Sequence, residues 1–157
     1  MKSFIRAAVL GVAVATTAVT SAFAVDELNV TATGLAMRGY DPVSYFNGGP
    51  QEGAFNITAV HEEATYRFAS EENKKTFLAN PEAYTPAFGG YCAYGLSVGS
   101  KFDGDPNVWA IVDDKLYLNL SAPVQKLWNK DQAEHLVNGN ANWEKIEHTA
   151  VAETLPK

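Results

Sequence analysis

Alternating hydrophobic and polar residues predict a β-hairpin in the first half of the chain. A period of two places one set of side chains on the buried face of a strand. The polar residues 61–64 lie between the two alternating stretches and have the length of a hairpin connection. The stretches, with the residues expected to share a face, are 54–60 (Phe55, Ile57 and Ala59) and 65–69 (Tyr66 and Phe68).

A second hairpin is predicted farther along the chain. Residues 108–112 (VWAIV) and 116–120 (LYLNL) are rich in the branched and aromatic side chains that strands prefer. They flank residues 113–115, which are all charged and suit a turn.

A helix is predicted between the two hairpins. Ser70 is a typical N-cap residue, and the two glutamates after it favour the positive end of a helix dipole. We expect this helix to bury Phe77 and Leu78 and to end at Asn80–Pro81, because proline cannot continue a helix.

Further helices are predicted after the second hairpin. Ser121 precedes apolar residues at helical spacing, namely Val124, Leu127 and Trp128. Another helix is expected over residues 131–137, ending at Asn138–Gly139. Two hairpins interleaved with short helices predict a compact single domain of the α+β class.

The N-terminus has the pattern of a secretory signal peptide. Lys2 and Arg6 precede a small, apolar stretch without charge, which closes on Ala22-Phe23-Ala24, a typical cleavage site. A membrane anchor is less favoured because threonine and serine dilute the stretch. We therefore expect a periplasmic or secreted protein with no membrane anchor after cleavage. The expected division is 1–24 signal peptide, 25–38 N-terminal arm, 39–147 domain and 148–157 flexible tail.

The negative net charge of the chain indicates which kinds of partner it can bind. Loss of Lys2 and Arg6 takes the formal charge from −6 to −8, since 10 basic residues then face 18 acidic ones. A surface this acidic is a poor match for nucleic acid or for anionic lipid. We expect a metal ion or another periplasmic protein as the partner, and leave the oligomeric state open.

Cys92 is the one cysteine of the chain. It lies in the segment Gly89-Gly90-Tyr91-Cys92-Ala93-Tyr94-Gly95, where the glycines allow close backbone approach and the aromatic residues could frame a pocket. In an oxidising compartment an unpaired thiol is buried, bound to metal, paired between chains or used in chemistry. A helix starting just after Gly90 would lower the pKa of the thiol.

His61 is the candidate second ligand. A thiolate and an imidazole together suit copper or zinc, whereas His61 could equally be a solvated loop residue. The other residues weighed as ligands are Met37, Asp41, Asp103, Asp105, His135 and His148. Of these, Met37 is expected to have a packing role and His135 to lie on the surface. The stretch Asp103-Gly104-Asp105 is expected to form a turn.

Six segments form an ordered set of motifs: Tyr40-Asp41-Pro42-Val43 with Tyr45-Phe46, Tyr66 with Phe68-Ala69-Ser70, Asn80-Pro81, Gly89-Gly90-Tyr91-Cys92-Ala93, Trp109 with Ile111-Val112-Asp113, and Ala141-Asn142-Trp143. In this order they resemble the YHS domain family, and in particular its exported bacterial YHS domain-containing (seleno)protein subgroup. The resemblance covers about residues 39–146.

This resemblance implies a compact α+β unit and an association with heavy metals, copper and silver above all. It also implies that the position of Cys92 can hold selenocysteine, which indicates soft-metal ligation or redox chemistry there. The multiple cysteines of many metal-associated relatives are absent here, which puts a closed multi-thiolate site in doubt.

Three functions are therefore open. The chain is expected first to be a soft-metal-binding module that holds copper through Cys92 and His61. It could instead be a thiol redox protein with Cys92 as its nucleophile, or a non-catalytic accessory subunit in which Cys92 only packs. No catalytic residue and no organic cofactor site is predicted.

Overall fold

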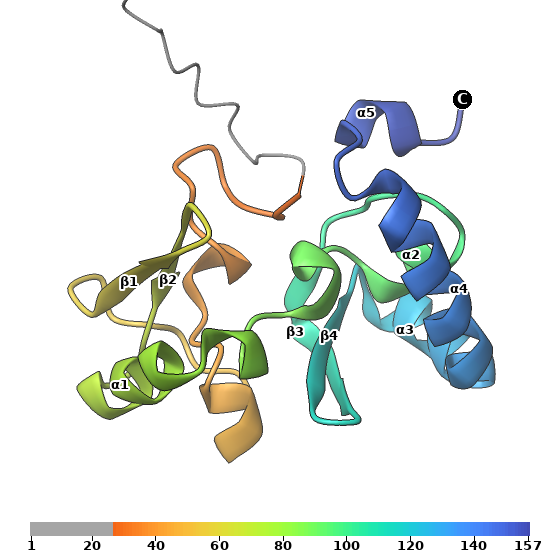
Figure 1. The fold of residues 1–157 in the computed structure, drawn as a ribbon. Helices are drawn as coiled ribbons and strands as arrows, with labels where there is room; N and C mark the ends of the chain where they lie inside the picture. Colours follow the sequence, from red (N-terminus) through yellow and green to blue (C-terminus); the bar gives the residue numbers. More distant parts are fainter. Residues whose placement is uncertain (1–26) are drawn as a thin grey trace, which may run out of the picture.

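The chain folds as an α+β domain with two small antiparallel sheets and several helices (Figure 1). The computed structural model describes residues 27–157, and the expected signal peptide lies outside them. The strands are β1 (Thr58–His61), β2 (Ala64–Arg67), β3 (Asp105–Val112) and β4 (Lys115–Asn119). The α-helices are α1 (Glu71–Ala79), α2 (Ala93–Ser97), α3 (Ala122–Trp128), α4 (Gln132–Ile146) and α5 (Val151–Thr154). The 3₁₀ helices described are Met37–Gly39, Ser44–Asn47, Pro81–Ala83, Ala87–Gly90 and Asn129–Asp131.

The first hairpin is confirmed, with a tighter turn than expected. His61 pairs with Ala64 at the end of β1, so the turn is only Glu62–Glu63, and both of its residues have positive φ. That backbone matches the twist of a two-residue hairpin turn. The expectation that His61 lies in the connection is therefore wrong.

Two apolar residues of this region are exposed, contrary to the sequence pattern. Phe55 precedes β1 and is 84% exposed, and the guanidinium of Arg67 stacks over its ring at 4.3 Å. Leu78 of α1 is 54% exposed, whereas the adjacent Phe77 is fully buried against Tyr66 and Phe68. The N-cap prediction is confirmed, since Ser70 accepts a hydrogen bond from the Asn73 N–H.

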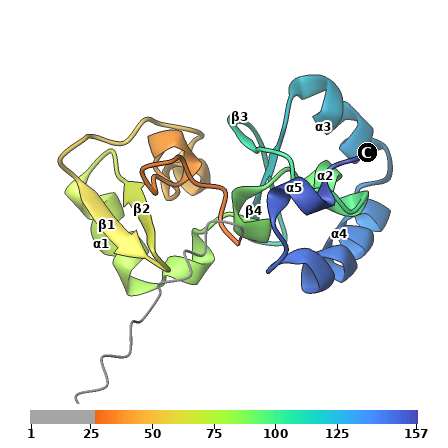
Figure 2. The ribbon, with the colours of Figure 1, turned by 90° about the horizontal axis from the view of Figure 1, so that it is seen from above.

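The β3–β4 hairpin separates two hydrophobic cores. Leu116 and Leu118 of β4 belong to the first core, whereas Tyr117 between them belongs to the second. Successive side chains of a strand point to opposite faces. The short strand β4 therefore contributes side chains to both cores. Figures 1 and 2 show the hairpin between the segment that carries β1, β2 and α1 and the segment that carries α2 to α5. The first core is Ala36, Met37, Val43, Tyr45, Ala64, Tyr66, Phe68, Phe77, Leu116 and Leu118, and the second is Phe88, Tyr91, Ala93, Leu96, Tyr117 and Trp128.

Helix α4 continues past Gly139, so the expected end at Asn138–Gly139 is wrong. A Cβ atom at Gly139 would lie 3.1 Å from Cζ of Phe88. The glycine is there because the helix crosses close to that ring, and it does not end the helix. Ser121 occupies the N-cap position of α3 as expected, although its side chain makes no capping hydrogen bond.

Residues 148–157, which were expected to form a flexible tail, make hydrogen bonds to the rest of the domain. The Lys101 ammonium is fully buried and donates to the carbonyl oxygens of Glu147 (2.7 Å) and Thr149 (2.8 Å), at the C-terminal end of α4. A cation there complements the helix dipole. Thr154 of α5 accepts hydrogen bonds from Ser100 and Lys101.

Within residues 27–157 the structure has no helix with the length and hydrophobicity that crossing a membrane requires.

Candidate functional site around Cys92

Cys92 begins helix α2 and caps it. The residue has extended backbone angles at the N-cap position, and its sulfur accepts a hydrogen bond from the Gly95 N–H at 3.3 Å. Its own N–H donates to the carbonyl of Phe102 (2.8 Å), and its carbonyl accepts from the Leu96 N–H (2.9 Å). The side chain therefore satisfies one of the N–H groups that a helix start leaves without a partner.

The thiol is sealed inside the domain beside Asn119. Cys92 is 1% exposed, and its sulfur lies 3.7 Å from Oδ1 of Asn119. Oδ1 also accepts a hydrogen bond from the Tyr94 N–H at 3.1 Å, which fixes the orientation of the carboxamide. Because Oδ1 can only accept, the Cys92 S–H donates to it. This arrangement stabilises the protonated thiol.

Burial raises the pKa of the Cys92 thiol above its ordinary value. Desolvation is the largest cause, because it disfavours the charged thiolate. Backbone N–H groups of Gly95, Leu120 and Tyr94 act in the opposite direction and lower the pKa by less. At neutral pH the sulfur is a thiol, which is neither a strong nucleophile nor a metal ligand.

The glycines of the motif are explained by backbone packing. A Cβ atom at Gly89, where φ is +60°, would lie 2.0 Å from the carbonyl oxygen of Glu27. One at Gly95 would lie 2.8 Å from the Phe102 ring. These positions accept no side chain because other segments press against them, so the glycines do not frame an opening to the sulfur.

His61 lies in β1, and the structure does not bring it to Cys92. Its ring packs edge-on against Phe77, with centroids 5.9 Å apart, and its Nε2 lies 4.0 Å from the Glu62 carboxylate. The polar contacts of the Cys92 sulfur are with the Asn119 carboxamide and with backbone N–H groups, and none of these is with a histidine. In the part of the chain that the structure describes, no three His, Cys, Asp or Glu residues gather as a metal site. The surroundings of the two residues therefore do not fit a copper site.

The other residues weighed as ligands have structural contacts. Asp41 is fully buried and accepts three hydrogen bonds, and Met37 is buried in the first core. His135 packs against the ring of Tyr94, and His148 pairs with Glu27 at 2.6 Å. These placements leave each side chain engaged away from Cys92.

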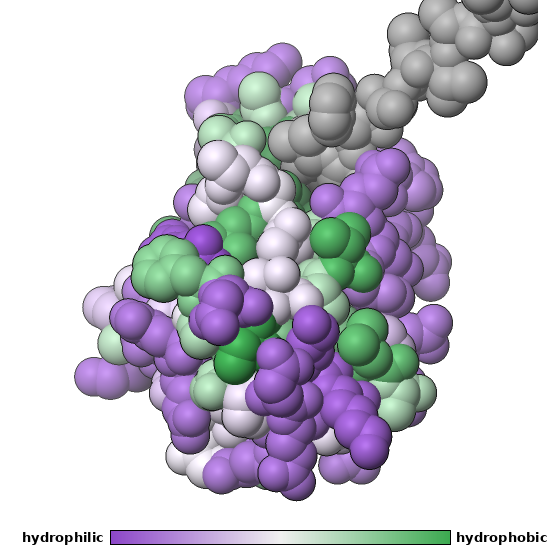
Figure 3. Space-filling view, turned by 90° about the vertical axis from the view of Figure 1, so that its left-hand side faces the viewer, coloured by the Kyte–Doolittle hydropathy of each residue, from purple (hydrophilic) through white to green (hydrophobic). Residues whose placement is uncertain are grey.

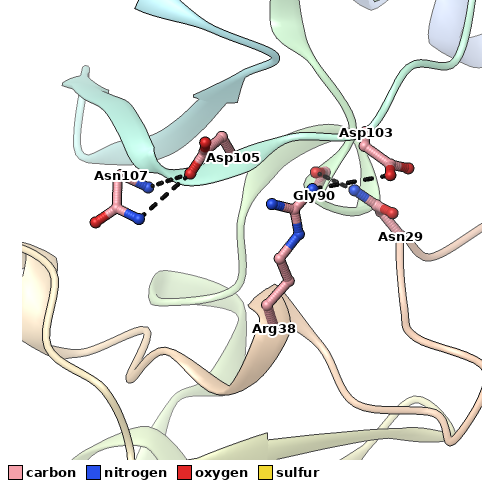
Figure 4. A network of polar contacts seen from close by, with 6 residues as sticks. All are labelled: Asn29, Arg38, Gly90, Asp103, Asp105 and Asn107. Carbon is pink, nitrogen blue, oxygen red and sulfur yellow. Dashed lines mark hydrogen bonds and ion pairs between the residues drawn. The ribbon is translucent and has the colours of Figure 1, made fainter.

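Asp103 and Asp105 lie at the start of the second hairpin (Figure 4). Asp103 pairs with Arg38 at 3.8 Å, and both side chains are more than half exposed. Asp105 accepts a hydrogen bond from the Asn107 N–H at 2.8 Å. A cavity of about 120 Å³ lies beside Gly90 and Asp103, and Cys92 does not line it.

The sequence analysis did not identify two buried polar residues near this site, Asn119 and Lys101. Side chains alternate between the faces of a strand, and this rule places Asn119 on the same face of β4 as Tyr117. No local pattern marks Lys101, because the carbonyls that it contacts lie more than 40 residues away.

Comparison of the chain with protein-family models, with curated proteins and with solved structures gave no match. The resemblance to YHS domains thus stays a prediction from the residues themselves.

Proposed function

We propose that this chain is an exported, non-catalytic accessory module of the YHS type, which acts by binding another protein outside the cytoplasm. The observation that carries the proposal is the state of Cys92: its sulfur is buried and caps α2. A side chain used in this way supports the packing role among the three functions open from sequence.

Soft-metal binding requires more than these contacts provide. Even a two-coordinate copper(I) site needs a thiolate and a second soft or imidazole ligand on opposite sides of the ion. The polar neighbours of the Cys92 sulfur are the Asn119 carboxamide and the backbone N–H groups of Gly95, Tyr94 and Leu120. Loading copper would break the α2 cap and expose the core, so copper binding through Cys92 and His61 stays a prediction without geometric support.

Thiol redox chemistry has the same difficulty. Attack on an oxidant or a disulfide requires a thiolate with access to its target. The Cys92 side chain is 1% exposed, and burial raises its pKa. Both properties slow the reaction.

The surface supports a binding role. Several large apolar side chains are exposed, among them Phe55 (84%), Val60 (69%) and Val137 (68%). Figure 3 views the side that carries the first hairpin and α1, where hydrophobic patches lie among hydrophilic residues. Such mixed surfaces are typical of protein contacts that form and dissociate.

Copper(I) titration tests whether the chain binds a soft metal ion. We expect the metal-free mature chain, Cys92→Ser and His61→Gln to compete equally poorly with a chromogenic copper(I) chelator. Stoichiometric binding by the wild type that is lost in Cys92→Ser, with both proteins folded by circular dichroism, would contradict the proposal.

Cross-linking in the exporting cell tests the partner. An amine-reactive cross-linker should give the same adduct with another protein for the wild type and Cys92→Ser, because the contact does not use the sulfur. An adduct that disappears in a folded Cys92→Ser variant, or a wild type that forms none, contradicts an accessory role.

A further inference from the structure

Strand β1 has an open edge. Thr65 of β2 donates its N–H to Gly34 (2.8 Å) and accepts from the Ala36 N–H (2.9 Å), so residues 34–36 cover the outer edge of β2. Backbone groups alternate in direction along an antiparallel pair, and Val60 lies opposite Thr65 while Thr58 lies opposite Arg67. The N–H and C=O groups of Thr58 and Val60 therefore point outward from β1.

Within residues 27–157, no other segment makes a backbone hydrogen bond to this edge. Exposed edges in soluble proteins are usually blunted by lysine, proline or a bulge. β1 has the sequence Thr-Ala-Val-His and pairs with β2 without a register shift. Val60 is 69% exposed beside the edge, and Phe55 is 84% exposed just before the strand.

We propose that β1 pairs antiparallel with β1 of a second copy of this chain, around a two-fold axis through Ala59. In this register Thr58 faces Val60 of the second copy, so all four outward N–H and all four outward C=O groups of the two strands find partners. Other registers leave part of this set facing solvent. The β1–β2 sheets of the two copies then join into one four-stranded sheet.

Charge complementarity supports the second copy as the occupant. The hairpin tip carries Glu62, whose side chain is 67% exposed. Antiparallel pairing brings this tip to the start of β1 in the other copy, where Arg67 stacks on Phe55. The two-fold axis repeats the contact between Glu62 of one copy and Arg67 of the other. The Phe55 ring beneath the Arg67 guanidinium then lies within the interface. An isologous interface of this kind closes as a dimer.

The interface is small, so the dimer is expected to dissociate on dilution. The acidic surface of each copy also opposes association at long range. The dimer does not depend on the proposed accessory role, and either can fail without the other.

Sedimentation of the mature chain over micromolar to millimolar concentration tests the proposal. The wild type should rise from one to two chain masses as concentration increases. Val60→Lys places a charge on the edge opposite Thr58 of the second copy and should stay at one chain mass. Val137→Lys changes an equally exposed valine on α4 and should dimerise as the wild type does.

Charge exchange tests the register. Glu62→Arg should weaken the dimer at least several-fold, and adding Arg67→Glu should restore it. A wild type that stays monomeric over the whole range, or a folded Val60→Lys that dimerises like the wild type, overturns the proposal. Failure of the double variant to recover, with both variants folded, overturns the two-fold register.

Discussion

Asp41 and Cys92 both use reactive groups for structural purposes. The Asp41 carboxylate accepts hydrogen bonds from the N–H groups of Val43 and Ala69 (both 2.8 Å) and from the Asn73 side chain (2.6 Å). It thereby joins the turn after Tyr40 to the first turn of α1. A buried carboxylate with several donors is held by bonds that are stronger than neutral ones.

Asp41→Asn should destabilise the domain by about 2–4 kcal/mol, because an NH₂ group would then face N–H donors in a buried site. Urea unfolding followed by circular dichroism measures this loss. Asp103→Asn is the matched control and should cost at most about 0.5 kcal/mol, since its ion pair with Arg38 is exposed. Equal effects of the two changes would contradict the role given to Asp41.

Cys92 is expected to make stability depend on alkaline pH. Burial raises the pKa of the folded thiol, so its contribution is complete below the ordinary pKa of about 8.5 and is lost as pH rises toward the folded value. Cys92→Ala should be less stable than the wild type by about 1–2 kcal/mol at neutral pH, through loss of the cap and of packing. The difference should shrink above about pH 8.5. A difference that grows with pH contradicts a raised pKa.

At the scale of elements, local patterns predicted those features that local contacts determine. The Ser70 cap and both hairpins follow from neighbouring residues and are confirmed. The prediction that the helix ends at Gly139 is wrong because the reason for this glycine, the ring of Phe88, lies about 50 residues away in the sequence. The exposure of Phe55 likewise follows from the later start of β1, which alternation alone does not show.

Gly139→Ala tests this explanation of α4. In an open helix the change stabilises by about 0.5–1 kcal/mol. Here the new Cβ would lie 3.1 Å from Phe88, whose ring is held between Tyr117 and Trp143. We expect a net loss of stability, whereas Asn138→Ala, on an exposed helical position, should gain a few tenths of a kcal/mol. Thermal unfolding of both variants gives the sign, and a stabilised Gly139→Ala would contradict the close contact.

Over the whole molecule, the two cores share the β3–β4 hairpin, so neither is complete without it. This arrangement also explains why the proposed Cys92–His61 pair could not be judged from sequence. His61 packs on Phe77 of the first core, and Cys92 lies between Tyr91 and Ala93 of the second. Their separation is a property of the tertiary arrangement, which residue types and spacing do not encode.

Because the β3–β4 hairpin contributes to both cores, we expect the two cores to unfold together. Trp109 packs on the first core, whereas Trp128 lies in the second. Two variants that each keep one of these tryptophans, the others being replaced by Phe, report on one core each. Within each variant the fluorescence midpoint in urea should coincide with that of circular dichroism. Midpoints that separate would show that one core unfolds first.

The accessibility of the Cys92 sulfur tests the central claim most directly. We would measure the rate of native-state thiol labelling by a maleimide at neutral pH as urea increases. If the sulfur is an internal cap, labelling follows global unfolding, and the free energy of opening equals the free energy of unfolding from circular dichroism. Labelling of the native protein at close to the rate of the unfolded chain would contradict the account and favour an available thiol.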